Sequence, residues 1–150
     1  MIDQKELRIG NYVCKTDNPQ SFLEHNFSPY IQVETISKTG VNAVTVYDED
    51  MDSEGIDYTP YVDELTFEQL HPILLTSELL EKCGFKDGRL TINISAVRPL
   101  YLQSANNGTV VFYWGEGNSQ PSPYSIHYEY LHQLQNLYFA LTGEEMEIKL

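Results

Sequence analysis

The sequence predicts an α+β protein in which a mainly antiparallel sheet packs on a C-terminal amphipathic helix. Short β-branched and aromatic runs alternate with tight-turn residues, as in antiparallel strands joined by hairpins. An apolar stripe with the period of an α-helix covers residues 130–141. The chain has 150 residues, of which 41% are hydrophobic, and this suits one domain of ordinary size. We therefore expect residues 1–150 to form a single α+β domain.

The N-terminal part of the chain favours strands. Three are predicted, at residues 7–13, 30–37 and 41–47. Gly40 ends the short turn between the second and third runs, which is typical of a hairpin. Alternation of apolar and polar residues breaks between Val33 and Ile36, which predicts a β-bulge. Because these strands are short and their turns tight, we expect them to form a small SH3-like barrel.

The middle of the chain predicts a loop, an edge strand and two short helices. Residues 48–57 are acidic and poor in apolar side chains, so a loop is expected, followed by an edge strand around Pro60. A capping box joins Thr66 to Gln69 at the start of a helix of about one turn. The next helix is predicted at residues 77–83, with Thr76 as its N-cap and a glycine-terminated C-cap.

The C-terminal part predicts a hairpin and a long helix. After an alternating run at residues 89–95, the dipeptide Asn107-Gly108 favours a two-residue type I′ turn. That turn would place Leu102 opposite Tyr113, and Tyr101 opposite Trp114. The apolar stripe of the last helix is followed by Gly143, a helix-ending residue. Alternation of Met146, Ile148 and Leu150 then predicts a final strand.

The charge of the chain argues against binding to nucleic acids or anionic membranes. The chain has 22 acidic and 9 basic residues, a net charge of −13. This excess repels the phosphates of nucleic acids and anionic membranes, and it favours a basic protein partner. The polar N-terminus and the lack of an apolar run of about 18 residues argue against a leader or a membrane span. With only two cysteines, we expect a cytoplasmic protein with reduced thiols.

Three stretches resemble a known family. They are ELRIGNYV at residues 6–13, LHPILLTSELLEKCGF at residues 70–85 and HQLQNLYFALTGEEMEI at residues 132–148, about a quarter of the chain. These motifs are similar to a family of small hypothetical proteins encoded by phages and mobile elements of gut bacteria. The resemblance implies only a context, that of a phage-type accessory gene product acting inside a bacterium, and it assigns no functional residue.

One acidic segment is the candidate partner-binding surface. Between Lys38 and Lys82 the sequence has eleven acids and no basic residue, with tyrosines interleaved. A tyrosine ring beside carboxylates can anchor an interface while the charges steer a basic partner. An EF-hand reading fails because Thr59 or Tyr61 would occupy the twelfth position, where glutamate is needed. The candidate residues are Asp48, Glu49, Asp50, Asp52, Glu54, Asp57, Tyr58 and Tyr61.

No catalytic, cofactor or metal constellation is predicted, so we expect a protein that is not an enzyme. Cys83 falls in the last turn of its predicted helix, where the helix dipole disfavours a thiolate, and it is interpreted as a buried small residue. His127 and His132 would lie about 140° apart on a helix, too far to share a metal, and are expected to be partly exposed. Phosphate-loop and nucleophile-elbow motifs are absent from the sequence.

Three functional hypotheses follow. The first is an accessory binding protein that engages a basic host protein through its acidic face, one form of which is mimicry of nucleic-acid charge. The second is a small-ligand protein or enzyme whose site is scattered in sequence, which predicts a deep pocket with shifted pKa values. The third is a structural or self-assembling phage component, with an oligomeric state that the sequence leaves open.

Overall fold

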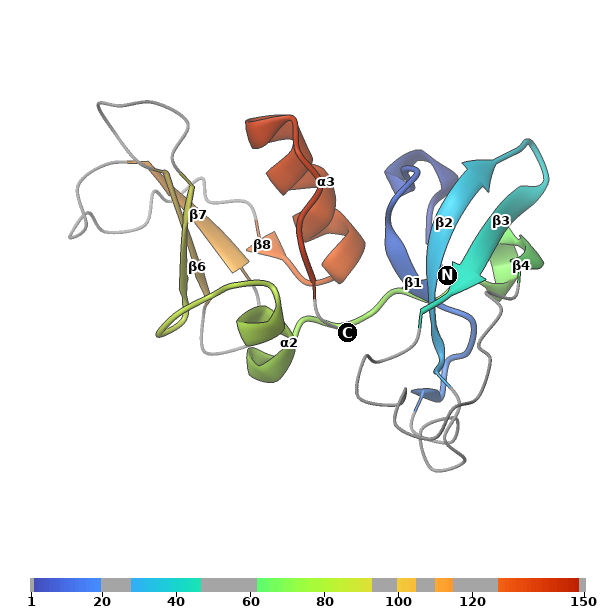
Figure 1. Cartoon of the computed structure of the whole chain (residues 1–150), viewed down its shortest axis with the longest axis horizontal. Helices are drawn as coiled ribbons and strands as arrows, with labels where there is room; N and C mark the ends of the chain where they lie inside the picture. The colour runs from blue at the N-terminus through green and yellow to red at the C-terminus, as the bar shows by residue number, and fades with distance from the viewer. Residues whose placement is uncertain are drawn as a thin grey trace, which may run out of the picture. The chain divides into compact units, whose positions relative to one another are not determined.

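The computed structural model describes residues 2–19, 28–46, 62–92, 100–104, 110–114 and 127–148. The chain divides into two compact units, Met1–Ile73 and Leu74–Lys149. Each unit contains its own four-stranded sheet, and every strand pair is antiparallel (Figure 1). The α+β class with a mainly antiparallel sheet and a C-terminal helix is therefore confirmed. Whether the two units form the single domain expected from the sequence is not tested, so that expectation stays a prediction.

The sheet of the first unit has the strand order β1-β2-β3-β4. Its strands are β1 (Tyr12–Cys14), β2 (Tyr30–Ile36), β3 (Gly40–Thr45) and β4 (Val62–Thr66), with the 3-10 helices η1 (Gln4–Glu6) and η3 (Phe67–Gln69) before and after them. Alternate residues of β2 and β3 point into one core, where Ile31, Val33 and Ala43 are at most 1% exposed. The register shifts between Val33 and Thr35, so the predicted β-bulge is confirmed.

The predicted SH3-like barrel is not closed in the described part of the chain. After η3 the chain returns to the outer edge of β1, where the Cys14 N–H donates to the His71 carbonyl at 2.9 Å and the His71 N–H donates back at 2.8 Å. This contact is an isolated bridge, whereas closure requires a continuous staggered ladder. Pro72 follows at once and has no backbone N–H, which disfavours a longer strand there.

The second unit joins another sheet to two helices. Its elements are α2 (Ser77–Lys82), β5 (Arg89–Ile92), β6 (Leu100–Ser104), β7 (Val110–Trp114), β8 (His127–Tyr128) and α3 (Leu131–Thr142), and the strand order is β5-β6-β7-β8. The predicted apolar stripe places Leu131 and Leu134 of α3 at 0% exposure. Gly143 has a φ of +74° and ends α3 as predicted, because glycine adopts this left-handed conformation without strain.

The predicted register of the second hairpin is wrong by one residue. Leu102 lies opposite Phe112, and Tyr101 lies opposite Tyr113. The last described pair is Ser104 with Val110, and the residues between them are not described. A two-residue turn cannot join strands in this register, whereas longer hairpin loops can. Asn107-Gly108 itself lies outside the described residues.

Two further local differences have simple causes. Asp87-Gly88 forms a tight hairpin that leads into β5, with φ values of +52° and +73°, and the backbones of Lys86 and Arg89 exchange hydrogen bonds of 2.9 and 3.0 Å. The final strand predicted from Met146 to Leu150 is not present in the described residues 144–148. Met146 is instead buried at 5% exposure by tertiary packing, which produces the same alternation without a strand partner.

The N-cap of α2 gives a first testable prediction. The Thr76 hydroxyl oxygen accepts a hydrogen bond from the Leu79 N–H at 3.1 Å. Thr76→Ala is expected to lower the free energy of unfolding by about 1 kcal/mol, because this N–H would lose its partner at the helix terminus. Urea denaturation measures the change, and Ser77→Ala, at the exposed first residue of the helix, is the matched control. Equal costs for the two variants would contradict the role of the cap.

Candidate functional site

The predicted partner-binding surface lies outside the described residues. Asp48, Glu49, Asp50, Asp52, Glu54, Asp57, Tyr58 and Tyr61 all fall in the range 47–61, of which the structure describes nothing. The arrangement of these residues is therefore not tested, and this surface stays a prediction. The candidate site must be sought among the other acidic residues.

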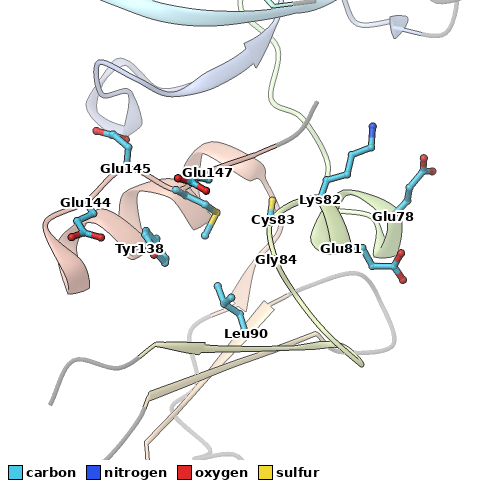
Figure 2. Close-up of a pocket in the computed structure, with 11 residues that line it drawn as sticks. Glu78, Glu81, Lys82, Cys83, Gly84, Leu90, Tyr138, Glu144, Glu145 and Glu147 are labelled. Carbon is cyan, nitrogen blue, oxygen red and sulfur yellow. The ribbon is translucent and has the colours of Figure 1, made fainter. Parts of the chain in front are cut away.

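The second unit contains a pocket of about 640 Å³, which we call the acidic pocket (Figure 2). It lies between α2, the start of β5, the last turns of α3 and the segment that follows α3. The described residues that line it are Glu78, Glu81, Lys82, Cys83, Gly84, Leu90, Tyr138, Glu144, Glu145, Met146 and Glu147.

The floor of the acidic pocket is apolar. Cys83 and Met146 are buried, with 4% and 5% of their surface exposed, and Leu90 and Tyr138 are half-buried. In Figure 2 the Leu90 side chain rises from β5 toward Cys83. The apolar residues of the pocket are therefore more deeply buried than its charged residues.

The end of α2 sets the shape of this floor. Gly84 has a φ of +87°, the Phe85 N–H donates to the Leu80 carbonyl at 3.0 Å, and the Gly84 N–H donates to the Glu81 carbonyl at 2.9 Å. These two bonds are the Schellman ending that the sequence predicts. The chain turns sharply after Cys83, which keeps the thiol at the base of the pocket while Leu79 and Leu80 face the core.

The rim of the acidic pocket is strongly negative. The described lining includes five glutamates and one basic residue, Lys82, and all six are exposed. Figure 2 shows Glu78 and Glu81 on α2, and Glu144 and Glu145 on the other side of the pocket. Carboxylates around an apolar wall of low dielectric produce a negative potential that attracts cations. The glutamates directly after Gly143 are the sequence signal for this site.

The environment of Cys83 disfavours the thiolate form. Burial raises the pKa of Cys83 to about 12, because the thiolate would lose its hydration. The thiol is therefore protonated at neutral pH, and the predicted buried small residue is confirmed. Burial likewise raises the pKa of Cys14, the other thiol of the chain.

The two histidines of the last segment differ. His127 is exposed on β8, whereas His132, which was expected to be partly exposed, is buried at 1% exposure. The His132 ring stacks on Tyr130 with centroids 5.9 Å apart and planes at 11°. The expectation failed because the buried face of α3 is wider than its apolar stripe and includes His132 and Gln135 beside the leucines.

Some kinds of site are not found in the described ranges. Within them, no group of three or more histidine, cysteine, aspartate or glutamate residues is arranged to hold a metal ion. The same part of the chain contains no helix that combines the length and hydropathy needed to cross a bilayer.

Comparison of the chain with protein-family models, curated proteins and solved structures finds no match. The function of the acidic pocket is therefore argued from its chemistry.

Proposed function

We propose that this protein is an accessory binding protein that engages a basic protein partner through its acidic, tyrosine-containing surface. The observation that carries the proposal is the acidic pocket, whose described lining has five glutamates and one lysine around an apolar floor. The resemblance to phage-encoded proteins supports a role inside a bacterium, in the cytoplasm of the host. The role is one of binding, without catalysis.

A basic protein suits this pocket better than a nucleic acid does. The net charge of −13 opposes the phosphate backbone, whose binding depends on lysine and arginine. Tyr138 supplies an aromatic ring beside the carboxylates, and tyrosine is enriched in the cores of protein interfaces. Rim charges of this kind accelerate association with a partner of opposite charge and make binding sensitive to salt.

Binding of a defined cationic probe tests the proposal. The full chain is titrated into a fluorescent nona-arginine peptide, with a nona-glutamate peptide as the negative probe, and anisotropy is measured at several salt concentrations. We expect saturable binding of nona-arginine that weakens as salt rises, because screening shortens the reach of the rim charges. The probe stands for the basic segment of the partner.

Two variants with equal charge changes localise the binding. The pocket variant carries Glu78→Gln, Glu81→Gln, Glu144→Gln and Glu147→Gln, and the control carries Asp17→Asn, Glu34→Gln, Glu64→Gln and Glu68→Gln on exposed positions of the first unit. The pocket variant is expected to bind about tenfold more weakly than the native chain, which corresponds to about 1.4 kcal/mol. The control should lose much less. Equal losses in both variants, or no binding by the native chain, would contradict the proposal.

A further inference from the structure

We draw no further inference here: the strongest candidate, the face of β5 and β6 on which the Arg89 guanidinium lies 5.2 Å from the centre of the Tyr101 ring, carries none, because nothing in the described part of the chain shows what would cover this face.

Discussion

Gly40→Ala is expected to lower the free energy of unfolding by about 3 kcal/mol, as core overpacking and strained backbones do. A Cβ atom at this position would overlap the Leu65 carbonyl oxygen and lie 2.9 Å from the carbonyl carbon and 3.0 Å from the Thr66 Cα. All three are backbone atoms, so no side-chain rotation can relieve the overlap. Because Gly40 pairs with Thr66 at the end of the β3–β4 ladder, the two strands would have to separate there.

Gly143→Ala is the matched control for Gly40→Ala. Gly143 has a positive φ, but nothing lies within 4 Å of the position that its Cβ would occupy. Its replacement should cost only the left-handed strain of an alanine, about 1 kcal/mol. Urea denaturation of both variants beside the native chain gives the comparison. If Gly40→Ala were the less costly of the two, the close approach of β3 and β4 would be refuted.

The second large effect is a loss of stability at alkaline pH caused by Cys83. Burial raises the pKa of Cys83 from its ordinary value of 9.0 to about 12, and unfolding removes this burial. Below pH 9 both states hold the proton, so stability is unaffected. Between the two values only the unfolded state releases it, so the free energy of unfolding falls by about 1.4 kcal/mol per pH unit, or about 4 kcal/mol in total.

Comparison with Cys83→Ala isolates this effect from other titrations. The variant loses packing but has no thiol at this position, so its stability should decline less steeply above pH 9. Urea denaturation from pH 7 to pH 11 measures the free energy of unfolding of both proteins. Between pH 9 and pH 11, the native chain should lose about 3 kcal/mol more than the variant. Parallel curves would mean that the folded and unfolded chains bind this proton equally well.

The sequence predicted best those features that depend on a few neighbouring residues. The N-cap at Thr76 and the left-handed glycine that follows the C-cap, Gly84, were predicted to the residue, because capping hydrogen bonds reach only three to five positions along the chain. The bulge after Val33 was visible as a break in alternation. The Asp87-Gly88 hairpin had an equally local signal, which the sequence interpretation overlooked.

Features that depend on distant residues were predicted less well. Barrel closure depends on how far the chain after η3 follows β1, and among the described residues this pairing is limited to Cys14 and His71. The β6–β7 register depends on the length of the connecting loop, which the Asn107-Gly108 dipeptide did not reveal. The burial of His132 depends on what α3 packs against, and its own polarity argued for exposure.

The candidate site depends partly on neighbouring residues and partly on residues far apart in the sequence. Its acidic residues are visible in the sequence as two short clusters, one before Gly84 and the other after Gly143. Their convergence is not visible, because Glu81 and Glu144 are more than sixty positions apart. The apolar floor is equally hidden, since Cys83, Leu90 and Met146 come from three segments that only the fold brings together.

The positions of the two cysteines make it possible to measure whether the two units open together or separately. Cys14 lies in the first unit and Cys83 in the second, and both are unpaired and buried. A buried thiol is alkylated only while its surroundings are transiently open, so each site records the opening of one half of the chain. Matching alkylation rates would indicate one cooperative transition, whereas rates that diverge would assign a separate opening equilibrium to each half.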